Sequence, residues 1–251
     1  MKIKTTLLCK GVELGIGLAS ITTLILAGCG GGSGSSSSNG GVTSYNFVAP
    51  VVGSQRIYTQ TIIDNSSNVI NLSFKDTTTI VNPDGSFSFQ EVDPISSVIT
   101  VNNTAYSIQA GTYADNNSGQ IISFTPLGVG ATTCTLTPHG TGPTYPITIG
   151  KTWTTTYTSS CGGAATTSQS GSVVGVESVT VPAGTFQTTK LQSTITWADI
   201  NGIYTDTGTN WRDVNTGIFV KRTVNHNYSY IVPPVNGYPL TTSIVFASGV
   251  L

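Results

Sequence analysis

Short runs of β-branched and aromatic residues, separated by turn clusters, fill the chain from Val42 onward. The clearest run is Val69–Val81, whose apolar face is expected to carry Ile70, Leu72, Phe74, Thr78 and Ile80. A period of two indicates a half-buried strand. Asn82-Pro83-Asp84-Gly85 then suits a tight turn, because proline presets φ and glycine accepts the left-handed conformation. Since no stretch after Val42 shows a convincing helical period, we predict an all-β, mainly antiparallel domain.

The domain is predicted to extend over residues 43–251, and an irregular stretch, Pro138–Pro146, divides it. The two sides open alike, with Pro50-Val-Val-Gly53 and Pro146-Ile-Thr-Ile-Gly150, and a strand-like run follows each. This similarity suggests two related halves, 43–137 and 146–251. An internal duplication is one interpretation, and chance similarity is the other.

The N-terminus carries three lysines, Lys2, Lys4 and Lys10, and then an apolar run, Leu14–Leu26. This pattern is typical of a secretory signal helix. About 13 uncharged residues are too few for a membrane-spanning helix, which needs about 20. The following Leu26-Ala27-Gly28-Cys29 resembles the lipobox of bacterial lipoproteins. The resemblance implies that residues 1–28 are a signal peptide and that Cys29 becomes acylated. The alternative is an ordinary signal peptide with an incidental cysteine.

Acylation at Cys29 would attach the protein to a membrane, because two or three acyl chains hold a protein durably. The next residue is Gly30, whereas an aspartate there is associated with inner-membrane retention in lipoproteins. We therefore expect the outer membrane of a two-membrane cell envelope. Residues 29–42 would be the lipidated cysteine and a Gly/Ser linker, GGGSGSSSSNGG, of the flexible kind.

Charged side chains are scarce in the mature sequence. Removal of residues 1–28 takes away three lysines and one glutamate and leaves 7 basic and 10 acidic residues, a net charge of −3. No basic patch for nucleic acid appears in that composition. The motif spacings of zinc or calcium sites are also absent. The sequence predicts no cofactor and no metal.

Two cysteines, Cys134 and Cys161, remain after the signal peptide and the lipidated position are set aside. In an oxidising compartment an even pair predicts a disulfide. Free thiols are the main alternative, and half of a metal site is a weaker one.

Several motifs between residues 146 and 222 resemble uncharacterised bacterial periplasmic and lipoprotein β domains. They are Gly150-Lys-Thr-Trp153, the hairpin Val181-Pro182-Ala183-Gly184-Thr185-Phe186, and Trp211 followed by Gly217-Ile-Phe-Val-Lys221. The resemblance implies a curved antiparallel sheet, as a half-barrel or a sandwich-like fold, and brings no catalytic residue. We predict that Pro182, Gly184 and Phe186 form a structural turn that contacts no ligand.

Catalytic candidates are few. Asp206-Thr-Gly-Thr209 spells the aspartic-protease signature, but the second copy that this chemistry needs is missing. His226 lies in the polar run Asn225–Tyr228, where an exposed histidine is expected, and His139 is the other histidine. Two carboxylates within about 6 Å in a cleft would favour hydrolysis.

The sequence therefore favours a lipid-anchored, non-catalytic binding or structural module for an apolar or polymeric envelope ligand. One alternative is an envelope hydrolase that uses Asp206 or His226. Another is a glycan-binding module with exposed Trp153, Trp197 or Trp211, although tryptophans of a β domain more often lie in its core.

Overall fold

The structure is a computed structural model that describes residues 43–93, 99–101, 104–106, 110–128, 130–140, 142–161, 166–198, 202–217, 219–230 and 239–249. The predicted all-β, antiparallel fold is confirmed, since the described residues form strands and turns and contain no helix. The expected signal helix and linker, residues 1–42, lie outside the described residues. The strands are β1 (Ser44–Tyr45), β2 (Gln55–Asp64), β3 (Val69–Val81), β4 (Phe87–Val92), β5 (Ile99–Val101), β6 (Thr104–Tyr106), β7 (Gly111–Asp115), β8 (Ile121–Pro126), β9 (Cys134–Thr137), β10 (Ile147–Thr148), β11 (Thr152–Ser159), β12 (Thr166–Val181), β13 (Gly184–Ala198), β14 (Gly202–Asp213), β15 (Phe219–Tyr230) and β16 (Pro239–Gly249).

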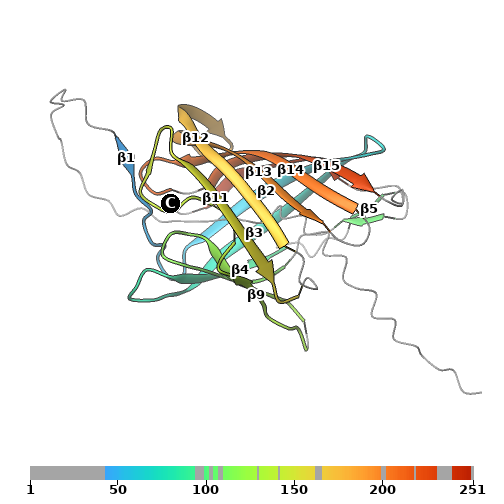
Figure 1. The fold of residues 1–251 in the computed structure, drawn as a ribbon, viewed down its shortest axis with the longest axis horizontal. Helices are drawn as coiled ribbons and strands as arrows, with labels where there is room; N and C mark the ends of the chain where they lie inside the picture. Colours follow the sequence, from blue (N-terminus) through green and yellow to red (C-terminus); the bar gives the residue numbers. More distant parts are fainter. Residues whose placement is uncertain are drawn as a thin grey trace, which may run out of the picture.

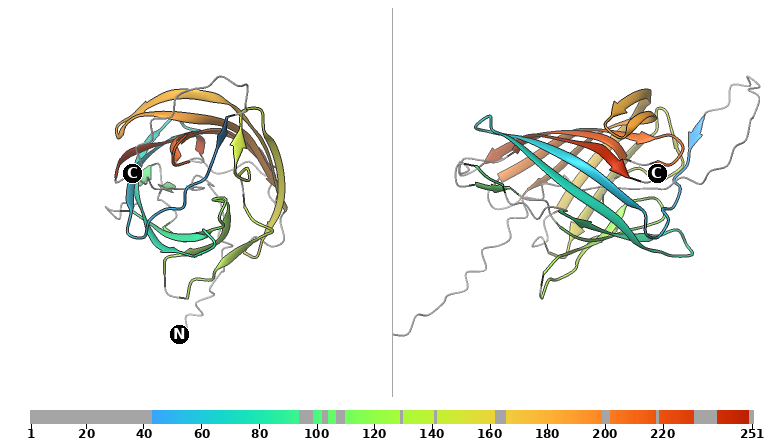
Figure 2. Two further views of the ribbon diagram at one scale, coloured as in Figure 1. Left: turned by 90° about the vertical axis from the view of Figure 1, so that its left-hand side faces the viewer. Right: turned by 180° about the vertical axis from the view of Figure 1, so that it is seen from behind.

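Twelve of these strands form a closed barrel (Figures 1 and 2). Their order around the barrel is β11-β12-β13-β14-β15-β16-β2-β3-β4-β7-β8-β9, with β9 paired to β11. Every pair is antiparallel, and most pairs join strands that follow each other along the chain. The predicted curved sheet thus closes on itself, which pairs the edges that an open sheet would expose.

The two predicted halves build one barrel together. β2 is hydrogen-bonded to β16, and β9 to β11, so both seams join residues from opposite sides of the stretch 138–146. At one end of the barrel, β1 pairs with β10. Phe47 follows β1 and stacks on Phe87 with ring centroids 5.8 Å apart. Residues 44–47 are therefore packed against one end of the barrel.

Alternation places the apolar face of β2, β3 and β16 inside the barrel. Tyr58 and Phe74 stack in the interior with centroids 5.1 Å apart, and Phe246 lies 5.5 Å from Tyr58. All three side chains have no exposed surface. These rings and the aliphatic side chains around them form the largest hydrophobic cluster of the described residues.

One detail of the predicted β3 face is wrong. Ile70, Leu72, Phe74 and Thr78 are buried as expected, but Ile80 is 52% exposed. The pairing of β3 with β4 shifts between Thr78 and Ile80. Such a bulge adds one residue and reverses the side-chain alternation after it.

A tight hairpin around Pro182 joins β12 to β13. β12 ends at Val181 and β13 begins at Gly184, which adopts a φ of +140°. Phe186 is buried and packs 6.0 Å from Phe246 in the main cluster. Cys134 and Cys161 form the predicted disulfide, which links the start of β9 to the turn after β11.

Candidate functional site

Asp206 and His226, the two residues of the hydrolase alternative, meet inside the barrel. They are cross-strand partners on β14 and β15, and His226 Nδ1 lies 2.8 Å from Asp206 Oδ1. On its other side, His226 Nε2 lies 2.9 Å from the Thr242 hydroxyl of β16. The expectation of an exposed His226 is wrong, because its side chain is 2% exposed. The polar residues directly before and after it face outward, whereas the histidine itself faces the barrel interior.

The aspartic-protease interpretation of Asp206 gains no support from this geometry. The carboxylate is hydrogen-bonded to a histidine, whereas the protease mechanism shares a proton between two carboxylates. The pairing of β14 with β15 is irregular at one point, between Trp211 and Arg212.

A carboxylate pair does occur elsewhere in the barrel. Asp76 of β3 pairs directly with Glu91 of β4, and Arg56 of β2 lies opposite Asp76 on the other side. Directly opposed residues have Cβ atoms about 4.5–5.5 Å apart. Burial raises the pKa of Asp76 to about 8, and the nearby Arg56 partly offsets that rise. All three side chains are fully buried and none of them lines the outer depression described below, so this pair is part of the barrel core.

Two further buried ionisable groups face the same interior. Burial raises the pKa of Asp115 well above its ordinary value, although Arg212 acts in the opposite direction. Burial also lowers the pKa of Arg222 to about 10, while Asp206 favours its charged form. The barrel interior is thus a mixture of aromatic clusters and compensating charges. None of these groups was recognisable as interior from its local sequence.

The three tryptophans do not form one platform. Trp153 and Trp197 are half-buried, and Trp211 is 9% exposed. Trp153 packs against an interior cluster with Ile147, whereas Trp211 lies beside Lys190 and Lys221. Trp197 stacks on Tyr204 with centroids 5.2 Å apart. The glycan-binding alternative in the form of a tryptophan platform therefore has no geometric basis among the described residues.

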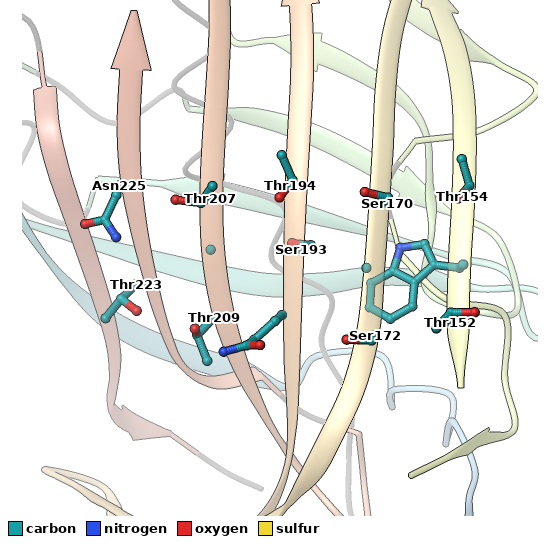
Figure 3. A pocket seen from close by; sticks show the side chains of 14 residues that line it. Thr152, Thr154, Ser170, Ser172, Ser193, Thr194, Thr207, Thr209, Thr223 and Asn225 are labelled. Carbon is teal, nitrogen blue, oxygen red and sulfur yellow. The ribbon is translucent and has the colours of Figure 1, made fainter. Parts of the chain in front are cut away.

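A cavity lies on the outer side of the barrel wall. It is a depression of about 640 Å³ over five neighbouring strands, β11 to β15. Ten of its lining side chains form what we call the outer hydroxyl face: Thr152, Thr154, Ser170, Ser172, Gln192, Thr194, Thr207, Thr209, Thr223 and Asn225. Figure 3 shows the depression, with all of these residues except Gln192 labelled. Every one is uncharged and able to donate and accept hydrogen bonds.

The sheet register arranges these side chains in rows. Thr154, Ser170, Thr194, Thr207 and Asn225 lie directly opposite one another on successive strands. A second row contains Thr152, Ser172, Gln192, Thr209 and Thr223. Sheet geometry spaces such groups by about 4.8 Å across strands and about 6.7 Å along them. The result is a regular two-dimensional array of hydrogen-bonding groups.

Between the two rows, Trp153 and three small residues also line the depression. Gly171, Ser193 and Gly208 are cross-strand partners between the two rows, and all three line the cavity. The depression contains no acidic, basic, histidine or cysteine side chain among its described lining residues, so no group there could activate a nucleophile.

Sequence reasoning missed this face, although its signal is visible. Thr152-Trp-Thr-Thr-Thr-Tyr-Thr158 and Thr166-Thr-Ser-Gln-Ser-Gly-Ser172 both place a hydroxyl at every second position. Thr242, by contrast, has no local signal, because its role depends on the register of three strands. No group of His, Cys, Asp and Glu side chains suited to a metal ion occurs in the described part of the chain.

Comparison with known proteins gives limited guidance. No family model and no curated protein matches the chain. A solved structure of a candidate exported protein with a YmcC-like fold from Bacteroides fragilis shares 14% identity, with 82% of this chain and 99% of that chain covered and a TM-score of 0.45. A candidate lipoprotein from Parabacteroides distasonis shares 12%, with 82% and 98% covered and a TM-score of 0.42. The hypothetical lipoprotein YmcC of Escherichia coli shares 15%, with 75% and 85% covered and a TM-score of 0.38. The functional argument therefore relies on the residues themselves.

Among the described residues, no helix is long and apolar enough to span a membrane.

Proposed function

We propose that the protein is a lipid-anchored cell-envelope module that binds an uncharged, hydroxyl-rich polymer, such as a neutral polysaccharide, on its outer hydroxyl face. The anchor would be Cys29, and Gly30 after it favours the outer membrane. The observation that carries the proposal is the uncharged array of ten hydrogen-bonding side chains around one depression.

The chemistry of the array matches that of a sugar polymer. Sugar hydroxyls donate and accept hydrogen bonds, as Thr, Ser, Asn and Gln side chains do. A repeating ligand can also engage several rows at once, so many weak contacts would add through multivalency. Because the face lacks charge, a neutral polymer would bind it without leaving a charge unpaired. Binding of this kind needs no catalytic residue at the face.

The test is adsorption of the full-length protein, solubilised in mild detergent, to an insoluble neutral glucan. We expect binding that changes little between low and high salt, since salt screens only charged interactions. Thr207→Lys puts a charge in the middle of the face and should weaken binding by at least tenfold. The matched control is Thr59→Lys, an exposed threonine on the outer side of β2, which should bind like wild type.

Two results would contradict the proposal. One is equal binding by Thr207→Lys and Thr59→Lys. The other is binding to an anionic polysaccharide alone, lost at high salt, because that would indicate an electrostatic site elsewhere.

A further inference from the structure

Three side chains on adjacent strands form a hydrogen-bonded chain that the binding function does not use. Asp206, His226 and Thr242 face the barrel interior from β14, β15 and β16. Their contacts are 2.8 Å from Asp206 Oδ1 to His226 Nδ1 and 2.9 Å from His226 Nε2 to the Thr242 Oγ1. We call this group the interior triad.

In this chain Thr242 has the position of a nucleophile, His226 that of the base that activates it, and Asp206 that of the acid that orients the base. An ionised carboxylate can only accept, so Asp206 requires a proton on His226 Nδ1. In the neutral imidazole, Nε2 then carries a lone pair and accepts the proton of the Thr242 hydroxyl. Arg222 also lies near this group, and Asp206 favours its charged form. Nucleophile, base and orienting acid are thus each in hydrogen-bond reach of the next.

Aromatic rings continue from the triad toward the end of the barrel. Tyr228 is two residues beyond His226 and lies parallel to its ring, with centroids 6.0 Å apart. Tyr204 meets Tyr228 edge-on at 5.5 Å, and Trp197 stacks on Tyr204. These three rings are half-buried, whereas Thr242 is 2% exposed. A substrate would therefore rest a flat apolar ring on the aromatic row and present only a small group to Thr242.

We propose that the interior triad is a second site, which hydrolyses carboxylic esters that have a short acyl group and a ring-bearing alcohol. Thr242 Oγ1 attacks the ester carbonyl while His226 Nε2 takes its proton. His226 returns that proton to the departing alcohol, which leaves an acyl ester on Thr242. A water molecule, deprotonated by His226, then attacks this ester and releases the carboxylic acid, and the proton returns to Thr242.

The experiment uses the full-length protein in mild detergent with p-nitrophenyl acetate. Release of p-nitrophenol is measured, and the protein is quenched in acid for peptide mass spectrometry. We expect turnover above that of the heat-denatured protein and an acetyl group on the peptide that contains Thr242. A long-chain p-nitrophenyl ester should react at least tenfold more slowly.

Variants separate catalysis from structure. Thr242→Val keeps the shape of the side chain without the hydroxyl and should lose about 10²–10⁴-fold in rate, as expected for loss of an activated group. Thr242→Ser should keep the rate within about tenfold and carry the acetyl group at the same position. The matched control is Thr61→Val, whose hydroxyl contacts Asn71 on the outer wall, and it should react like wild type.

The proposal fails if the wild-type protein gives no turnover above the denatured control and no adduct on Thr242. It also fails if Thr242→Val, folded by circular dichroism, hydrolyses as fast as wild type. If Thr242→Val does not fold, an unreactive and unlabelled Thr242→Ser would overturn it equally. None of these results bears on polysaccharide binding at the outer hydroxyl face.

Discussion

Substitution of Asp76 by Asn should make the protein more stable above neutral pH. Asp76 is fully buried between Arg56 and Glu91 on the neighbouring strands. Burial raises its pKa to about 8 in the folded protein. An unfolded chain has an aspartate pKa of about 3.9. Between these two values the folded protein holds a proton that the unfolded chain has released.

The sign of the effect follows from that difference. The protonated Asp76 contributes its full stability below about pH 4, and this contribution is lost as the pH rises through about 8. A shift of about four pKa units, at 1.36 kcal/mol each, corresponds to about 5 kcal/mol as an upper value. That is a large part of the 5–15 kcal/mol by which domains are usually stable. Asn has nearly the same shape and no proton to lose, so Asp76→Asn should not show this loss.

Urea unfolding at pH 5, 6, 7 and 8 measures the difference. We expect the difference in stability between Asp76→Asn and wild type to be smallest at pH 5 and to grow as the pH rises toward 8. At pH 8 the variant should be more stable by several kcal/mol, with an unchanged dependence on urea. The control is Asp84→Asn, an exposed turn residue whose pKa is lowered by a hydrogen bond from Ser86, and it should leave the pH profile unchanged. If Asp76→Asn is less stable than wild type at pH 8, Asp76 is ionised and paired with Arg56, and the reasoning from burial is wrong.

Three further predictions concern the hairpin, the anchor and the disulfide. Gly184→Val should cost a few kcal/mol through strain at a φ of +140°, and Phe186→Ala about 3–5 kcal/mol through a cavity, whereas Ser178→Ala should melt like wild type. If the first two variants also melt like wild type while binding is lost, the hairpin is a recognition loop. Cys29→Ala should move the protein from the membrane fraction to the soluble fraction and abolish lipid labelling; retention in the membrane would refute the lipobox interpretation. Reduction of Cys134–Cys161, which are 27 residues apart, should lower stability by about 3–4 kcal/mol, measured by urea unfolding with and without reductant. An unchanged unfolding midpoint would show that the bridge does not constrain the unfolded chain.

Local features of the fold could be predicted from the sequence because they depend on neighbouring residues. The alternation in Val69–Val81 indicates a strand, and the Pro182–Gly184 turn defines which residues face each other across the hairpin. Closure of the barrel is different. Tyr58 donates a hydrogen bond to the carbonyl of Phe219, which is 161 residues away. A single sequence gives no register for strands so far apart.

The same limit explains the errors at the site. His226 appears polar and exposed in its own segment, but the pairing of β15 with β14 places it beside Asp206 in the interior. Asp76 and Glu91 likewise become neighbours only through the pairing of β3 with β4. The outer hydroxyl face was within reach, because period-two threonine and serine patterns recur in β11 and β12. To predict this face, one must compare the polar positions of neighbouring strands with each other, as is usually done for the apolar positions.

The central claim is that an uncharged polymer binds the outer hydroxyl face. Hydroxyl-radical footprinting of the full-length protein, with and without a neutral polysaccharide, locates the contact directly. The account predicts protection on peptides of β11 to β15, especially 152–159 and 202–213, and none on β2 and β3. Protection confined to β2 and β3, or no protection while the polymer is bound, would contradict it.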